Sequence, residues 1–288
     1  MSISPKNYNK PSVFTPESLL REARRQKNIV EGSIPKICIL DPDGDIVHNL
    51  VQAGLARQNP YWACYHTQMH EFTYDGMEFG IVGNVVGSSF AVLVAEEMMA
   101  SGCELLLSMT SAGQIISKGT PPYFVLIESA LRDEGTSYHY LPPTDFSTLN
   151  RALLEHMTDA FRSFRLPVFT GSTWTTDAPF RETETAIEYS RSLGIFGVEM
   201  EAAALYAFAE AKDKPIVCFA HITNQMGSVE NDFEKGEAMG SVDALEVLSH
   251  AAKTWRGGYL TRYPANIPPR RMHSSQTRMK LKKRAAMT

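Results

Sequence analysis

The sequence predicts an α/β fold, a single domain in which helices flank a central mixed, mostly parallel sheet. Short apolar, β-branched runs alternate along the chain with longer stretches whose apolar residues recur at helical spacing. Alternation of this kind is typical of a sheet covered by helices. The chain has 288 residues, 43% of them hydrophobic, so it is long and apolar enough to bury one large core.

The first half of the chain predicts helix, strand, strand, helix and strand. TPESLLREARRQKN begins with the capping residue Thr15 and a proline at the first helical position, which predicts a short amphipathic helix. KICIL and residues 77–86 are apolar and read as strands. FAVLVAEEMMASG predicts a helix that ends at Gly102. ELLLSM is the next strand, and we expect the small residues TSAG after it to form a turn.

The second half continues the alternation. Apolar runs predict strands at PYFVLIESAL, PVFTGST, IFGVEM and PIVCFAHIT, and helical spacing predicts helices at ALLEHMTDAFRSF, ETETAIEYSRSLG and EAAALYAFAEA, with a long final helix to Trp255. We therefore divide the chain into an N-terminal extension with a short helix (residues 1–35), one domain (36–258) and a basic, flexible tail (259–288).

Composition excludes several classes of function. No stretch approaches eighteen consecutive apolar residues and the start MSISPKNYNK lacks an apolar signal core, so we expect a cytoplasmic protein without a membrane partner. The four cysteines are far apart, which predicts buried reduced thiols and no metal site. The net charge is −4, although residues 270–284 carry seven Lys and Arg and no acid. We interpret that run as a solvated segment rather than a nucleic-acid site.

The polar residues that stand out follow the predicted strands. Ligands on α/β sheets bind beyond the carboxyl ends of the strands, which directs attention to DPDGD, GSS, TSAGQ, TWTTDAPFR, VEMEA and HITNQ. In VEMEA, Glu199 and Glu201 flank Met200 where a strand meets an alanine-rich helix. Acids at a helix start also favour the helix dipole, so spacing alone leaves both a structural and a functional interpretation open.

Three segments together resemble a known family. GVEMEAAAL (197–205), EEMMASGCELLLSMTSAGQI (96–115) and RDEGTSYHYLPP (132–143) are similar, in order and spacing, to the nucleoside phosphorylase family that includes uridine phosphorylase, hexameric bacterial purine nucleoside phosphorylase and methylthioadenosine nucleosidase. The resemblance covers roughly residues 36 to 255. It implies that Glu201 accepts hydrogen bonds from the ribose hydroxyls, that Met200 packs on the sugar and that Glu199 lies close by. A carboxylate there would favour the positive charge that develops on the sugar.

The resemblance also implies where the base is bound. TWTTDAPFRET lies where the family binds the base. Trp174 would therefore stack on the base, and Arg181 would donate a hydrogen bond to one of its carbonyl oxygens. Core packing is the alternative for Trp174, and an ion pair with Glu182 or Glu184 is the alternative for Arg181. Asn224 stands where purine-cleaving members carry an acidic aspartate, and Gln225 falls near the edge of the base. An amide cannot protonate a leaving base.

The phosphate site departs from the family. Its first turn, DPDGD, contains Gly44 but is rich in acid, and Ser108 and His70 stand where the family has arginines. Ser111 remains as a possible hydroxyl ligand. Carboxylates beside a phosphate repel it, and arginine is the side chain best suited to binding it.

The resemblance implies a nucleoside phosphorylase-like glycosyltransferase that cleaves the N-glycosidic bond to give base and sugar 1-phosphate. Arg181, Asn224 and Gln225 favour a pyrimidine nucleoside over a purine one. Inorganic phosphate would be the co-substrate, and no cofactor is expected. The alternatives are a nucleosidase that uses water and a non-catalytic nucleoside-binding protein. The family completes each site with a neighbouring subunit, and His70 lies in the segment that crosses, so we expect a homo-oligomer, a dimer or a trimer of dimers.

Overall fold

The computed structural model describes residues 6–227, 230 and 232–259. Within these residues a single ten-stranded mixed sheet runs through the molecule in the order β10-β6-β8-β9-β5-β1-β4-β3-β2, with β7 paired to β6. The strands are β1 (Ile37–Asp41), β2 (Ala56–Gln58), β3 (His70–Tyr74), β4 (Met77–Gly83), β5 (Leu105–Gln114), β6 (Tyr123–Asp133), β7 (Phe146–Thr148), β8 (Val168–Thr176), β9 (Gly197–Glu199) and β10 (Ile216–Asn224).

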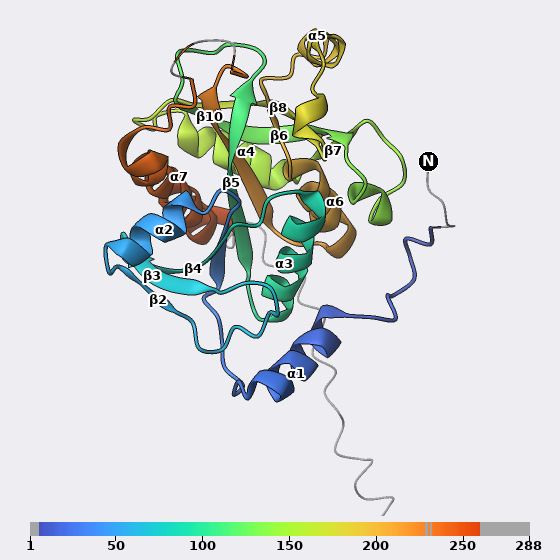
Figure 1. Cartoon of the computed structure of the whole chain (residues 1–288), viewed down its shortest axis with the longest axis vertical. Coiled ribbons are helices and arrows are strands. Elements are labelled where there is room, and N and C mark those ends of the chain that lie inside the picture. The colour runs from blue at the N-terminus through green and yellow to red at the C-terminus, as the bar shows by residue number, and fades with distance from the viewer. Residues whose placement is uncertain (1–5, 228–229, 231, 260–288) are drawn as a thin grey trace, which may run out of the picture.

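Helices connect the strands. The α-helices are α1 (Pro16–Lys27), α2 (Asp45–Gln52), α3 (Ser88–Ala100), α4 (Arg151–Phe161), α5 (Glu184–Ser192), α6 (Ala202–Lys212) and α7 (Ser241–Thr254). The shorter helical turns are η1 (Ser137–His139), η2 (Pro179–Arg181), η3 (Glu237–Gly240) and the π-helical η4 (Trp255–Tyr259). Figure 1 shows α3 and α6 on one side of β5 and α2 and α7 on the other. The predicted α/β class with a sheet between helices is confirmed.

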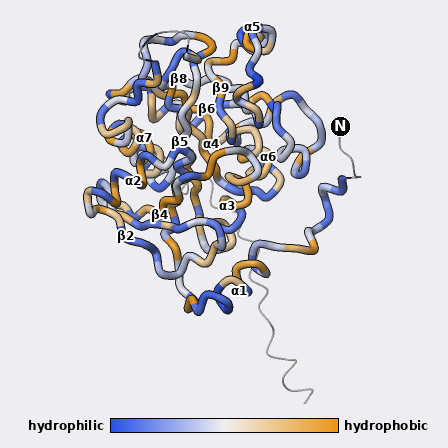
Figure 2. The backbone as a smooth tube through the Cα atoms, in the orientation of Figure 1, coloured by the Kyte–Doolittle hydropathy of each residue, from blue (hydrophilic) through white to orange (hydrophobic). Residues whose placement is uncertain are grey.

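Parallel pairing forms the centre of the sheet. β1 lies parallel between β4 and β5, and β10 lies parallel to β5 on the other side. β10 also pairs with β6, so β5, β10, β6, β8 and β9 close into a ring. All residues of β1 and β10 are buried, as continuous apolar runs in parallel strands predict. Hydrophobic stretches accordingly run through the middle of the molecule, while α1 is largely hydrophilic (Figure 2).

The entry helix forms as the sequence predicts. The Thr15 side chain accepts a hydrogen bond from Ser18 N, Pro16 opens the helix, and Asn28 ends it in the left-handed region. The apolar side of α1 is buried in a small cluster with Ala63, and α1 packs on α3. The extension is therefore attached to the domain through α3. The basic segment 270–284 lies outside the described residues.

Three expectations from the sequence are wrong in detail. TSAG is not a turn, because β5 continues through it to Gln114. A side chain at Gly113 would have little room, because a Cβ there would lie 2.3 Å from Met226 Sδ and 3.4 Å from Val198 Cγ1 of β9. The strand expected to reach residue 86 ends at Gly83. The turn DPDGD leads into α2, a helix the sequence did not predict, whose N-cap Gly44 has a φ of 82° that favours glycine.

Candidate active site

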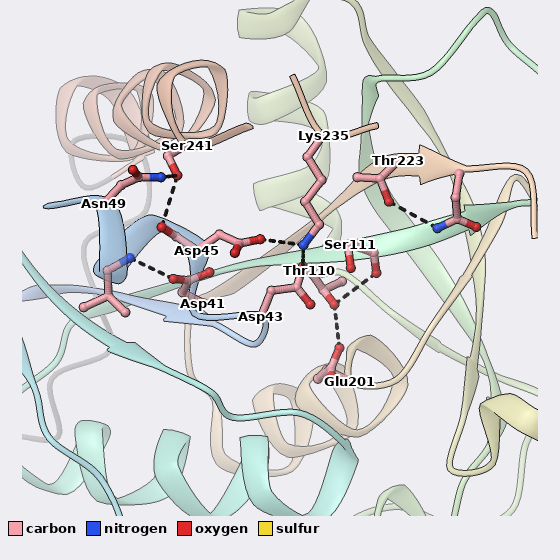
Figure 3. Close-up of polar contacts among 12 residues, drawn as sticks. Asp41, Asp43, Asp45, Asn49, Thr110, Ser111, Glu201, Thr223, Lys235 and Ser241 are labelled. Carbon is pink, nitrogen blue, oxygen red and sulfur yellow. Dashed lines mark hydrogen bonds and ion pairs between the residues drawn. The ribbon is translucent and has the colours of Figure 1, made fainter. Parts of the chain in front are cut away.

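Glu201 stands at the junction of β9 and α6, where it is the N-cap residue of α6. Its side chain is buried, and both carboxylate oxygens are held. Oε1 accepts a 2.7 Å hydrogen bond from Gly87 N. Oε2 accepts a 2.8 Å hydrogen bond from Thr110 Oγ1 (Figure 3). Burial, and secondarily the charge of Glu199, raise the pKa of Glu201 to about 8.

Glu199 lies behind Glu201 and supports it. Its Oε1 accepts hydrogen bonds from the hydroxyls of Thr173 and Thr175, at 3.0 and 2.5 Å. Its Oε2 accepts from the backbone N–H groups of Glu201 and Ala202, each at 2.7 Å. Four donors within the protein therefore occupy this carboxylate, which fixes the start of α6. Burial raises the pKa of Glu199.

Met200, between the two glutamates, is half-buried, and its carbonyl accepts a 2.8 Å hydrogen bond from Ser88 Oγ. Ser88 is the first residue of α3 and follows Gly87. The start of α3 thus contacts the VEMEA segment twice, once through each of these residues. The structure brings together the three residues expected at the sugar, with Glu201 held between α3 and β5.

The acidic turn, residues 41–45, is contacted by a lysine that the sequence did not mark as a site residue. Lys235 Nζ lies 3.0 Å from Asp43 Oδ2 and 2.5 Å from Asp45 Oδ2, and Figure 3 shows its side chain reaching between the two carboxylates. The third aspartate, Asp41, accepts a 2.9 Å hydrogen bond from Val47 N. Burial raises the pKa of Asp41 to about 7. Lys235 lies in the polar segment DFEKGE, where nothing in the spacing marks it.

The segment that carries Lys235 is attached to α2. Asn49 Nδ2 donates hydrogen bonds to the Ala238 carbonyl at 2.6 Å and to Ser241 Oγ at 2.9 Å. Ser241 Oγ in turn donates to the Asp45 carbonyl at 3.2 Å. These contacts join the start of α7 to the helix that begins in the acidic turn, so the chain just after Lys235 is held against that turn.

A cavity of about 20 Å³ lies between the acidic turn, β5 and the start of α7. Among its lining residues are Asp43, Thr110, Ser111, His221 and Lys235. The buried His221 ring stacks on Phe124 with 4.5 Å between ring centroids. Burial, and secondarily the charge of Lys235, lower the pKa of His221 to about 4, so its imidazole is neutral near pH 7. Thr110 connects this cavity to Glu201.

The four residues expected at the phosphate site separate into two pairs. Ser111 lines the cavity, and Gly44 lies in the acidic turn beside it. Ser108 is buried within β5, and its hydroxyl has no hydrogen-bond partner among the described residues. His70 lies on β3, separated from β5 by β4 and β1. Within the described chain, therefore, neither Ser108 nor His70 lines this cavity.

The residues expected at the base are not gathered around Glu201. Trp174 is buried in a small hydrophobic cluster, and its Nε1 donates a 3.0 Å hydrogen bond to Asp133. It alternates along β8 with Thr173 and Thr175, which bind Glu199, so it points to the opposite face. Arg181 is exposed on η2 and forms no ion pair with any residue in the described ranges.

The two residues at the end of β10 take part in the turn that follows. Asn224 Oδ1 accepts a hydrogen bond from Met226 N at 2.9 Å, and its Nδ2 donates to Thr223 Oγ1 at 3.2 Å. Gln225 N donates to the Asp232 carboxylate, as does Gly227 N. Asp232 precedes Lys235 by three residues, so these contacts join the end of β10 to the segment that carries the cavity lysine.

Across the part of the chain that the structure describes, no group of His, Cys, Asp and Glu side chains is arranged to hold a metal ion. In the same part, no helix has the length and hydropathy needed to cross a membrane. The four cysteines are buried and form no disulfide.

Comparisons with known proteins agree on one family. The family model described as the phosphorylase superfamily matches residues 36–253. A DeoD-type purine nucleoside phosphorylase of Bacillus velezensis is 27% identical over 161 residues, which cover 54% of this chain and 67% of that one. The guanosine phosphorylase of Halorubrum lacusprofundi is 22% identical over 188 residues, which cover 64% and 76%. The crystal structure of uridine phosphorylase from Vibrio fischeri ES114 has a similar fold, with a TM-score of 0.65 at 18% identity, over 78% of this chain and 92% of that chain.

Proposed function

Because the chain belongs to the phosphorylase superfamily, we propose that it is a nucleoside phosphorylase-type enzyme that cleaves the N-glycosidic bond of a nucleoside. One observation carries the proposal. The buried Glu201 carboxylate is fixed by Gly87 N and Thr110 Oγ1 at the start of α6, beside a cavity lined by polar groups. A fixed carboxylate next to a polar cavity suits a sugar whose hydroxyls must be oriented and whose reacting carbon becomes positively charged.

Glu201 has two tasks in this reaction. Its oxygens accept hydrogen bonds from the ribose 2′ and 3′ hydroxyls, which orients the sugar. As the bond to the base breaks, the sugar becomes a cation, and a nearby positive charge favours the ionised form of a carboxyl group. The developing cation therefore lowers the raised pKa of Glu201, and the attraction is strongest in the transition state, where it accelerates the reaction.

Asn224 supports a pyrimidine nucleoside over a purine one. It lies at the end of β10, where its amide donates and accepts hydrogen bonds but has no proton to transfer to a leaving purine. Arg181 is exposed on η2 and does not line the cavity beside Glu201, so this preference rests on Asn224. The relatives named above are purine, guanosine and uridine phosphorylases, so both base classes belong in any test.

The relatives' names make inorganic phosphate the first candidate for the group that accepts the sugar. Ser111 and Lys235 line the cavity and are the groups of this chain best placed to donate hydrogen bonds to it. Water is the second candidate, favoured by a specific observation: Asp43 and Asp45 already neutralise Lys235.

The experiment is a product assay over a panel of purine and pyrimidine nucleosides, with and without phosphate. We expect base release from at least one nucleoside, fastest with a pyrimidine. The sugar product, free or as the 1-phosphate, identifies the acceptor. If calorimetry detects nucleoside binding but no base is released in either condition, the chain is a binding protein and the proposed activity is wrong.

A further inference from the structure

We propose that water rather than phosphate accepts the sugar in this chain, and that Asp43, held by Lys235, takes the proton from that water. This inference rests on the proposed cleavage of a nucleoside and specifies its second substrate. Three features of the cavity beside Glu201 support it: its charge, the hydrogen bonds it offers and its position.

The charge of the cavity opposes phosphate. Lys235 is the only Lys or Arg among the described residues that line it. Its Nζ contacts both Asp43 and Asp45, and the Asp41 carboxyl adds a third acid to the lining. A phosphate dianion would lose water and meet these carboxylates, and like charges at short range are unfavourable. A neutral water molecule meets no such penalty.

The hydrogen bonds of the cavity suit water. Asp43 and the Ser111 hydroxyl can accept from it, and Ser111 can also donate. The buried His221 ring lines the same cavity, and its nitrogens form no hydrogen bond with any residue in the described ranges. A cavity of about 20 Å³ holds one water molecule. Phosphate needs several donors, and this lining offers few.

The cavity also lies next to the sugar site. Thr110 lines the cavity and donates to Glu201 Oε2. One residue therefore contacts both the cavity proposed to hold the water and the carboxylate proposed to bind the sugar. Figure 3 shows the Asp43 carboxylate in contact with Lys235, and Asp43 and Thr110 both line the cavity. Burial and the charge of Glu199 raise the pKa of Glu201, and the charge of Asp43 acts more weakly in the same direction.

The reaction balances without a further reactant. The water oxygen forms a bond to the anomeric carbon of the sugar while the carbon–nitrogen bond to the base breaks. The electron pair of that bond leaves with the base, which takes a proton from solvent. The water proton moves to the Asp43 carboxylate, which later returns it to solvent. Lys235 is a positioning residue, since its 3.0 Å contact with Asp43 Oδ2 holds that carboxylate in place.

The decisive measurement is base release by the wild type with and without phosphate, in water enriched in oxygen-18. We expect equal rates in both conditions, and labelled free sugar as the product. Release that requires phosphate and yields sugar 1-phosphate would overturn this inference and leave the proposed function standing. Absence of release from every nucleoside in both conditions would overturn the proposed function, and this inference with it.

Two variants test the assigned groups. Asp43→Asn should lower the rate about a hundredfold or more, since a general base contributes at least that much. The double variant Asp43→Asn, Asp45→Asn frees Lys235 and should make sugar 1-phosphate when phosphate is present. Unchanged hydrolysis in both variants, with wild-type melting curves, would contradict the role of Asp43.

The matched control is Lys36→Met. Lys36 forms an ion pair with Glu104, 2.8 Å between Nζ and Oε1, at the opposite ends of β1 and β5 from the cavity. Lys36→Met removes a Lys–carboxylate pair whose residues directly precede β1 and β5 and do not line the cavity. We expect its rate and its products to match those of the wild type. If either variant of the acidic turn fails to fold, the wild-type comparison with and without phosphate still decides between water and phosphate.

Discussion

The hydroxyl of Thr110 donates a 2.8 Å hydrogen bond to Glu201 Oε2, so β5 fixes the carboxylate that begins α6. Thr110→Val keeps the shape of the side chain but removes this donor. A hydrogen bond to a charged group contributes about 1.5 to 3 kcal/mol, so kcat/KM should fall roughly 10- to 150-fold. Thr110→Ser restores the hydroxyl and should recover most of the activity. If both variants lose activity equally, the hydroxyl is not what positions Glu201.

Glu201→Gln should remove most of the activity while the fold persists, since glutamine keeps the size of the side chain. Loss of one preorganised contact to a developing charge costs about 2.7 to 4 kcal/mol, or roughly a hundred to a thousand in rate. The exposed Glu188→Gln on α5 is the control and should behave as the wild type. Wild type should also reject a 2′,3′-dideoxynucleoside far more strongly than the variant does. Equal discrimination by the two proteins would show that Glu201 does not contact the ribose hydroxyls.

Glycine 240 should be more important for stability than other glycines of similar backbone geometry. Gly240 and Gly54 have φ angles of 78° and 67°, but a Cβ at 240 would lie 2.4 Å from His221 Cε1, whereas one at 54 would meet nothing within 4 Å. Gly54→Ala should therefore cost only the backbone strain, about 1 to 2 kcal/mol. Gly240→Ala should cost more in urea unfolding and should also reduce activity, because the segment that carries Lys235 must move. Equal costs at the two positions would contradict the close packing described here.

The free energy of unfolding should depend on pH through Glu201. Its pKa is about 8 in the folded chain and near 4.5 when unfolded, so the folded state binds more protons between these values. Stability is therefore lost as pH rises through this window, by about 1.4 kcal/mol per pH unit for one proton. The difference in unfolding free energy between wild type and Glu201→Gln should follow that slope in urea titrations. A difference that does not change between pH 5 and 8 would show that Glu201 is ionised in the folded protein.

We predict a homo-oligomer built at minimum on a dimer. His70 lies on β3, near the β2 edge of the sheet, and its Nδ1 is buried without a hydrogen-bond partner among the described residues. The resemblance to the nucleoside phosphorylase family implies that this segment reaches a neighbour's site. Light scattering at micromolar concentration should give a mass that is a multiple of 32.1 kDa. A monomer would contradict active sites shared between subunits.

Elements with one dominant local signal could be predicted from the sequence. The strands β1 and β10 are continuous apolar runs, and α1 has a capping threonine, a proline and regular apolar spacing. By contrast, α2 begins inside DPDGD, whose residues favour a turn, and it has only eight residues. TSAG was expected to be a turn because small residues are common in turns. Here they allow β9 and the turn after β10 to approach β5 closely.

The site was predictable only in part, for a similar reason. Glu201 and Ser111 belong to segments whose resemblance to the family marked them in advance, and both lie at or beside the cavity. Lys235 was missed because its partners, Asp43 and Asp45, precede it by about 190 residues and no local pattern connects them. Trp174 was expected to stack on a base, but its place in β8 directs it into a hydrophobic cluster. Which face a strand residue occupies depends on pairing that one sequence does not reveal.

We expect the attachment of Lys235 to the acidic turn to delay the proposed activity during synthesis. The turn is complete within the first 45 residues, but Lys235 and Ser241 follow β10, near the end of the fold. Contacts between such distant segments form late, because closing a long loop is costly in entropy. A nascent chain that has just completed β10 contains Glu201 and Thr110, but its Asp43 and Asp45 do not yet have Lys235 as a partner. Catalysis should therefore begin only after α7 has left the ribosome.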